Sequence, residues 1–180
     1  MLSKILSKTS CAACKFCCSF RRQSLWETPL FPQEVAEKLS RENEYGVVGE
    51  FTSVYCKIRD ACEIRDAREA QIAFRLVLEN NYRTDDPEEE VPCTFLDPQK
   101  GCILKGEDKP FDCSIWPLRI MNKDGKLVIA LTPTCSAIGG MPSKALVELV
   151  QNGLGEKIFE YAQTHPYIVK EYKDGFPIIL

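Results

Sequence analysis

The sequence lacks the features of several large functional classes. It contains a single histidine, His165, so neither a Cys2His2 zinc site nor a two-histidine iron site can be built from it. It has no glycine-rich loop followed by Lys and Ser or Thr, and no G-x-G-x-x-G motif, so the common phosphate-binding and dinucleotide-binding loops are missing. No cysteine pair is followed by histidine, which excludes covalent attachment of c-type haem.

Long apolar runs and an excess of basic residues are also missing. No stretch approaches the roughly 18 apolar residues that cross a bilayer, and residues 1–10 contain no apolar core typical of a signal peptide. The formal net charge is −3, so no overall field attracts nucleic acid. We therefore expect a cytoplasmic protein that binds neither membranes nor nucleic acid.

Cysteine, in contrast, is abundant, with ten in 180 residues. A chain of this length can bury a hydrophobic core without disulfides, and cytoplasmic thiols are kept reduced. Reduced thiols at such a density are usually metal ligands or redox groups. The composition therefore points to metal or redox chemistry before any motif is considered.

The first cysteine group is a Cys-x2-Cys-x2-Cys-Cys motif at residues 11–18, formed by Cys11, Cys14, Cys17 and Cys18. A helix would place Cys11, Cys14 and Cys18 on one face, whereas a loop would form the kind of knuckle that wraps iron–sulfur clusters or zinc. Because Cys17 and Cys18 are adjacent, their side chains point in different directions. We expect one of them to join the site and the other to serve a second metal or a redox role.

The second cysteine group lies between residues 92 and 135, and its members are Cys93, Cys102, Cys113 and Cys135. Each of the first three stands beside turn-forming residues, which can hold thiols on rigid loops where they converge. The two groups could form two tetrathiolate sites, could interleave, or could complete one cluster and leave thiols over. Cys56 and Cys62 match no ligand spacing, and we expect them to be small buried apolar residues.

The remaining pattern predicts an α+β fold: one small domain over residues 1–180, with short helices and β-hairpins around a cysteine-ligated metal centre. Apolar periodicity and Pro32 predict a helix over residues 33–39. Residues 72–78 favour a strand, although a helix extending from residue 61 competes with it. The other expected elements are a strand at 51–58, helices at 61–70, 143–150 (ending near Gly153) and 156–163, a hairpin of 118–121 with 127–131, and a terminal hairpin of 167–172 with 176–180.

Four motifs, in this order along the chain, resemble the YkgJ-like CxxCxxCC cysteine-cluster family. They are residues 11–18, Pro92–Asp97, Gly101–Ile103 and Pro110–Pro117. The resemblance implies a domain that chelates zinc or iron, or an iron–sulfur protein, without an established general reaction. It also implies that Cys93, Cys102 and Cys113 are ligands. The chain departs from the family pattern at residues 103–106 and at Ser114, where a basic residue is common. A similar cysteine cluster occurs in the flagellin lysine methylases.

From these observations we expect an iron–sulfur cluster, in the form [4Fe–4S], with a redox or electron-transfer role and an unknown protein or redox partner. The chain could then act as an iron–sulfur oxidoreductase. The alternative is a zinc protein with a structural or regulatory site and a partner-binding surface. A cluster-dependent enzyme similar to a methyltransferase is a third alternative, by analogy alone. We find no independent catalytic constellation, and Asp97, Asp112 and Trp116 are better explained by turns and core packing.

Overall fold

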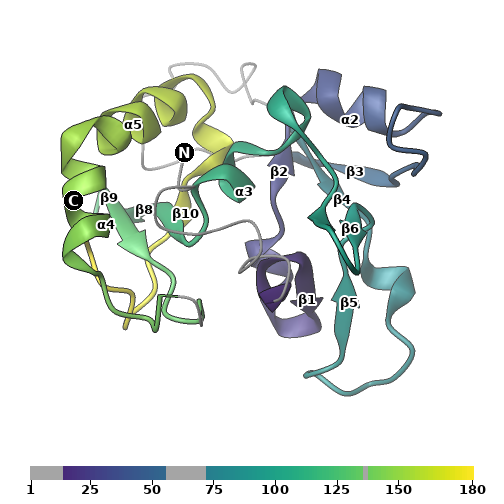
Figure 1. The fold of residues 1–180 in the computed structure, drawn as a ribbon, viewed down its shortest axis with the longest axis horizontal. Coiled ribbons are helices and arrows are strands. Elements are labelled where there is room, and N and C mark those ends of the chain that lie inside the picture. The colour runs from purple at the N-terminus through teal and green to yellow at the C-terminus, as the bar shows by residue number, and fades with distance from the viewer. Residues whose placement is uncertain (1–13, 56–71, 136–137) are drawn as a thin grey trace. The chain divides into compact units, whose positions relative to one another are not determined.

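The computed structural model describes residues 14–55, 72–135 and 138–180 (Figure 1). Contacts divide the chain into two compact units. The described part of unit 1 comprises residues 114–135 and 138–180 with Tyr55 and Ile72, and that of unit 2 comprises residues 14–54 and 73–113. Short helices and small sheets occur in the same chain, which confirms the expected α+β class. The expectations of one domain and of a metal centre inside it stay predictions.

Unit 2 is built around a three-stranded sheet with strand order β2-β4-β3. The strands are β2 (Leu30–Phe31), β3 (Phe51–Tyr55) and β4 (Ile72–Leu76), and β2 runs antiparallel to β4. Both longer strands fall where the sequence predicts them; residues 56–58 of the predicted strand and the predicted helix at 61–70 lie outside the described residues. Residues 72–76 form the strand and not the competing helix, and Arg75 and Phe74 pair with Leu30 and Phe31 of β2.

Helix α2 (Gln33–Leu39) forms as the sequence predicts, directly after Pro32. Glu34 in its first turn and Lys38 in its last turn both complement the helix dipole. Its apolar face carries Val35, Ala36 and Leu39 into a core that also contains the following side chains: Phe20, Phe31, Leu76, Leu78, Val91, Phe95 and Leu104. This core lies under the segments that carry the cysteines of unit 2.

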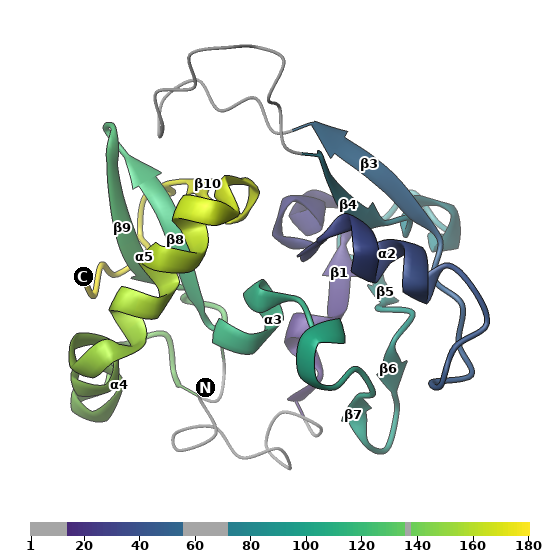
Figure 2. The ribbon, with the colours of Figure 1, turned by 90° about the horizontal axis from the view of Figure 1, so that it is seen from above.

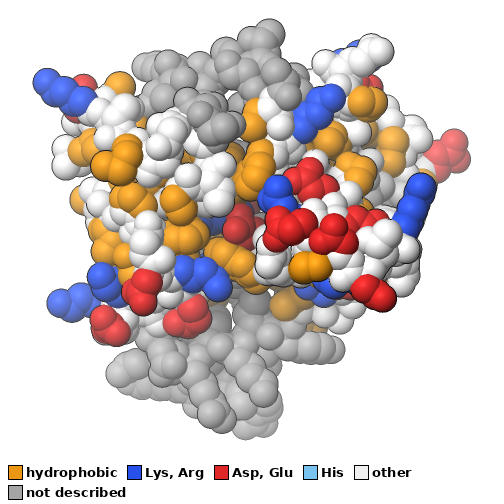
Figure 3. Space-filling model, turned by 90° about the horizontal axis from the view of Figure 1, so that it is seen from below, with side chains coloured by type: hydrophobic (Ala, Val, Ile, Leu, Met, Phe, Trp, Pro, Cys, Tyr) orange, Lys and Arg blue, Asp and Glu red, His pale blue; other side chains and the backbone are white. Residues whose placement is uncertain are grey.

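Two short ribbons complete the sheets of unit 2. Strands β1 (Ser19–Arg21) and β5 (Glu90–Pro92) pair antiparallel, while β6 (Leu96–Asp97) and β7 (Gly101–Cys102) form a hairpin. At the outer end of β1 and β5, Arg21 forms ion pairs with Glu88 at 3.0 Å and Glu90 at 2.5 Å. Figure 3 shows acidic side chains gathered around a basic one on a face of this unit. Short 3-10 turns link these strands: η1 (Phe16–Cys18), η2 (Arg22–Glu27), η4 (Glu79–Asn81) and η5 (Gly106–Asp108).

Unit 1 contains the hairpin of β8 (Leu118–Lys123) and β9 (Lys126–Leu131), which confirms the predicted hairpin. Its connection is the two residues Asp124 and Gly125, both at positive φ, and the strands extend further than predicted. Such a turn matches the right-handed twist of paired strands. In Figure 2, α5 (Gly155–Thr164) lies beside β8.

The C-terminal helices follow the sequence prediction. Helix α4 (Lys144–Leu149), capped by Ser143, is joined to α5 by a π turn (Val150–Leu154) that contains a kink, with non-helical backbone angles at Asn152 (φ −93°, ψ 40°) and Gly153 (φ 108°). The break therefore falls at the predicted Gly153, and the apolar side chains Val150, Leu154 and Ile158 around it are buried. The α5 helix covers the range predicted for it, and a 3-10 turn, η7 (Pro166–Ile168), follows.

The predicted terminal hairpin, in contrast, does not form, so this prediction is wrong. Strand β10 (Lys170–Glu171) pairs parallel with β8, whereas Leu180 and Pro177 accept hydrogen bonds from Ile129 and Leu131 on β9. The two segments bind opposite edges of the β8–β9 hairpin, whose outer N–H and C=O groups would otherwise lack partners. Among the described residues, no helix is long and apolar enough to cross a membrane.

Candidate metal centre

Five cysteines of unit 2 lie within electrostatic reach of one another, and we call them the thiol cluster: Cys17, Cys18, Cys93, Cys102 and Cys113. Cys17 interacts electrostatically with each of the other four. Cys18 also interacts with Cys93 and Cys113. The members come from separate parts of the sequence: η1, the loop after β5, β7, and helix α3 (Phe111–Ile115). The fold therefore joins the two cysteine groups that the sequence separates by more than 70 residues.

The backbone of η1 turns the first cysteine group toward the second. Lys15 has a φ of 53°, a left-handed conformation that interrupts a regular helix between Cys14 and Cys17. The N–H of Cys18 donates to the Lys15 carbonyl at 2.9 Å, which closes the 3-10 turn. Of the two alternatives left open by the motif, the described residues 14–18 therefore favour a knuckle over a continuous helix.

A direct backbone contact joins η1 to the second group. The N–H of Cys93 donates to the carbonyl of Cys18 at 2.7 Å, which extends the β1–β5 ladder by one step. This hydrogen bond fixes the backbone of Cys93 beside that of Cys18. The carbonyl of Cys93 then accepts from Leu96 at 2.9 Å, so the chain turns at once into β6.

The β6–β7 hairpin brings Cys102 back toward Cys93. Cys102 pairs with Leu96 across the ladder. The Asp97 carboxylate accepts hydrogen bonds from the backbone N–H groups of Gln99 at 2.8 Å and Lys100 at 2.7 Å, which holds the turn. Asp97 is therefore a turn residue, as the sequence predicts.

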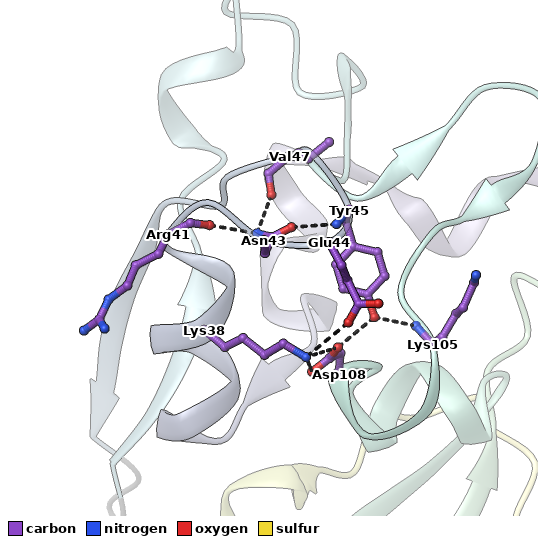
Figure 4. Close-up of polar contacts among 8 residues, drawn as sticks. All are labelled: Lys38, Arg41, Asn43, Glu44, Tyr45, Val47, Lys105 and Asp108. Atoms are coloured by element: carbon purple, nitrogen blue, oxygen red, sulfur yellow. Dashed lines mark hydrogen bonds and ion pairs between the residues drawn. The ribbon is translucent and has the colours of Figure 1, made fainter.

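A partly exposed polar network around the buried Asp108 anchors the loop between Cys102 and Cys113 to α2 (Figure 4). Asp108 in η5, 8% exposed, accepts hydrogen bonds from the Lys38 ammonium at 2.7 and 2.9 Å and from the Tyr45 hydroxyl at 2.7 Å. The Tyr45 hydroxyl also accepts from the N–H of Lys105 at 3.4 Å. These contacts were not predicted, because the partners lie about 60 to 70 residues apart and no local pattern relates them. Asp108 thus positions the segment that leads into α3.

Four thiols of the cluster have raised pKa values, which favour their neutral form. A hydrogen bond with Cys17, followed by burial and neighbouring thiols, raises the pKa of Cys18. Burial raises the pKa of Cys93 to about 12, and burial also raises the pKa of Cys102 and of Cys113. Several thiolates packed together would repel one another, and a bound cation would offset that repulsion. The electrostatics of the thiol cluster thus suit a bound cation.

The donor chemistry fits a soft metal, but the described residues do not hold a finished ligand geometry. Sulfur is the donor preferred by iron–sulfur clusters and zinc, and Cys18, Cys93, Cys102 and Cys113 have free thiols. The Sγ atoms of Cys17 and Cys18 are 3.9 Å apart. Across the described ranges 14–55, 72–135 and 138–180, no three cysteine, histidine or acidic side chains are close enough to hold a metal ion as they stand. Side-chain rotation or small loop movements would have to complete the set.

The other predicted ligands are placed differently. Cys14 is exposed at the start of the described chain, and Cys135 is buried in unit 1, where its N–H lies 3.5 Å from the Thr132 carbonyl. Cys11, Cys56 and Cys62 lie outside the described residues. Their roles stay predictions.

The other residues noted in the sequence analysis are Trp116, His165 and Asp112. The guanidinium of Arg119 lies over the ring of Trp116, 4.7 Å from the ring centre. The ring of His165 stacks on the ring of Tyr161, with 4.0 Å between the ring centres. Asp112, 1% exposed, adds negative charge beside Cys113 and thereby helps to raise the pKa of that thiol.

Comparison of the chain with protein-family models, with curated proteins and with solved structures finds no match in any of the three. The family resemblance therefore stays a prediction.

Proposed function

We propose that this protein binds metal through cysteine thiolates of unit 2, and that the metal is an iron–sulfur cluster with a redox or electron-transfer role. One observation carries the proposal: Cys17 lies within electrostatic reach of its neighbour Cys18 and of three further thiols, Cys93, Cys102 and Cys113, that come from three other segments. Buried neutral cysteines that serve only as apolar residues have no reason to gather in this way. A metal would offset the repulsion between their thiolates.

The residues that would hold the cluster are Cys93, Cys102, Cys113 and one of the pair Cys17 and Cys18. Each of the first three stands in a short segment fixed by backbone hydrogen bonds or by the Asp108 network. When bound, the cluster would supply one-electron chemistry. The protein would supply the sulfur ligands and a half-buried site whose neighbouring backbone N–H groups tune the reduction potential.

A structural or regulatory zinc site is the alternative, because zinc accepts the same four sulfurs. A [4Fe–4S] cluster also uses four cysteine sulfurs, so the fifth thiol does not distinguish the two proposals, and the content of iron, zinc and acid-labile sulfide decides between them. Both proposals require reduced thiols, so we propose the cytoplasm as the compartment. The protein or redox partner is unknown.

The test is anaerobic purification of the full chain, followed by an absorption spectrum and measurement of iron, zinc and acid-labile sulfide. A brown protein with broad absorption near roughly 400 nm and matched iron and sulfide supports the proposal. A colourless protein with stoichiometric zinc would replace it with the zinc alternative. A protein that takes up neither metal after anaerobic reconstitution would overturn both.

A further inference from the structure

Cys17 and Cys18 form a dithiol within the thiol cluster. They are consecutive residues of η1, both half-buried, and their Sγ atoms lie 3.9 Å apart in hydrogen-bonding contact. The same turn is closed by the hydrogen bond from Cys18 to Lys15 and tied to β5 by the hydrogen bond from Cys93 to Cys18. The two sulfurs are therefore kept together by the backbone.

The thiol cluster contains one sulfur more than a tetrathiolate site uses. Cys93, Cys102 and Cys113 approach the dithiol from three segments, and one of its two sulfurs completes a set of four. The second sulfur, 3.9 Å from the first, then stands beside a ligand without being one. A thiol in that position can attack its neighbour once the neighbour has been oxidised.

We propose that Cys17 and Cys18 are a site of reversible disulfide formation with a low-molecular-weight disulfide, and that closure of this disulfide withdraws a ligand and releases the metal. The release rests on the proposed function; the disulfide does not. One cysteine sulfur attacks the reagent, forming a mixed disulfide and expelling one thiolate. The second cysteine sulfur attacks the first, forming the Cys17–Cys18 bond and expelling the other thiolate. The two cysteines lose two electrons and two protons, and the reagent is reduced to two thiols.

Reversibility follows from the geometry of adjacent residues. Consecutive Cα atoms are about 3.8 Å apart across a trans peptide, which is shorter than the roughly 4.4–6.8 Å that disulfides usually span. A disulfide between neighbours is therefore strained and is reduced more readily than a structural one. Reduction would restore the ligand.

The disulfide can be located directly in the wild-type chain. Trypsin cleaves after Lys15 and Arg21, so both cysteines fall in one peptide, Phe16–Arg21. The metal-free full chain is treated with oxidised glutathione, alkylated and digested, and the peptides are weighed by mass spectrometry. We expect this peptide to be two hydrogens lighter and to carry no alkyl group, and dithiothreitol to restore double alkylation. A peptide that is fully alkylated, or that is linked to a peptide containing Cys93, Cys102 or Cys113, would overturn the proposal.

Metal release is a separate measurement on metal-loaded protein. Oxidised glutathione should lower the bound metal roughly tenfold or more in the wild type and in Cys62→Ser, the control at a cysteine that matches no ligand spacing. Of Cys17→Ser and Cys18→Ser, one should lose metal without oxidant, and the other should keep metal and resist release. If both single variants lose metal, both sulfurs are ligands and the release mechanism is wrong. If no preparation holds metal, the proposed function fails, while the peptide measurement still decides the disulfide.

Discussion

At the scale of single residues, the candidate site depends on groups whose charge state the fold controls. Burial and neighbouring thiols raise the pKa values of Cys93 and Cys113, whereas hydrogen bonds from Lys38 and Tyr45 lower the pKa of Asp108. The raised pKa values of the thiols favour thiolates bound to metal over free thiolates, and the ionised Asp108 holds the loop that leads to Cys113. A single substitution can therefore disturb either the ligands or their support.

Replacing Cys93 by Ser should lower the amount of bound metal by roughly tenfold or more, because the substitution removes a thiolate ligand from the segment tied to Cys18. Elemental analysis of the anaerobically purified variant measures this. Cys62→Ser, at a cysteine that matches no ligand spacing, is the control and should keep its metal. Wild-type metal content in Cys93→Ser would contradict the assignment of Cys93.

Replacing Asp108 by Ala should lower the free energy of unfolding by about 1–3 kcal/mol, because Lys38 and Tyr45 lose a charged acceptor. Urea unfolding of the metal-free protein measures this. Glu44→Gln is the control: Glu44 is exposed and reaches the same lysine only at 3.5 Å, so stability should change little. Equal unfolding midpoints for the Asp108 variant and the wild type would contradict the role given to the network.

The same network predicts a pH dependence. Burial alone would raise the pKa of Asp108, but the hydrogen bonds from Lys38 and Tyr45 outweigh it and hold the pKa below its ordinary value of 3.8. A carboxyl with a lowered folded-state pKa contributes stability that is present above its unfolded pKa and is lost as the pH falls through the folded one. Asp108→Asn should therefore show a shallower loss of stability below about pH 4 than the wild type. Parallel acid limbs in the two proteins would contradict this.

At the scale of elements, short segments are held by turns and by backbone pairing. The β8–β9 hairpin is closed by Asp124 at a φ of 52° and Gly125 at a φ of 80°. Gly125 has open space where a side chain would stand, so its requirement for glycine comes from the backbone alone. The hairpin in turn provides the edges that bind β10 and the last residues of the chain.

Gly125→Ala should lower the free energy of unfolding by about 1 kcal/mol, because alanine tolerates a left-handed backbone poorly. Asp124→Asn is the matched control, since asparagine accepts the same conformation. Urea unfolding followed by circular dichroism compares the two. A larger loss in the asparagine variant than in the alanine variant would contradict this account of the turn.

At the scale of the whole molecule, metal binding should be coupled to stability and to protons. Thiols bind metal as thiolates, so the raised pKa values of the cluster mean that binding must release protons. A ligand that binds only the folded chain stabilises it, by about 4 kcal/mol at a thousandfold excess over its dissociation constant.

Metal-loaded protein should therefore unfold at a higher urea concentration than metal-free protein, and metal affinity should rise between pH 7 and 9 as thiols ionise more easily. Urea titrations with and without metal, and metal competition assays at both pH values, measure the two effects. An affinity that is independent of pH would show that thiolates are not the ligands. Identical urea midpoints would show that binding is not coupled to folding.

The sequence by itself determined the local elements and the chemical type of the site. Helix α2, strands β3 and β4, the β8–β9 hairpin and the turn at Asp97 follow from residue periodicity, proline and turn-forming residues, which act over a few neighbours. The density of cysteine and the single histidine also decide that any metal here is bound mainly by sulfur.

Only the tertiary structure decided which parts meet. It placed Cys17 and Cys18 beside Cys93, Cys102 and Cys113, and it tied Asp108 to Lys38 and Tyr45. It also sent the last residues to β9, because pairing the open edge of the hairpin outweighed the local turn signal of Gly175. Contacts between distant residues depend on packing and backbone pairing, which no short stretch of sequence contains.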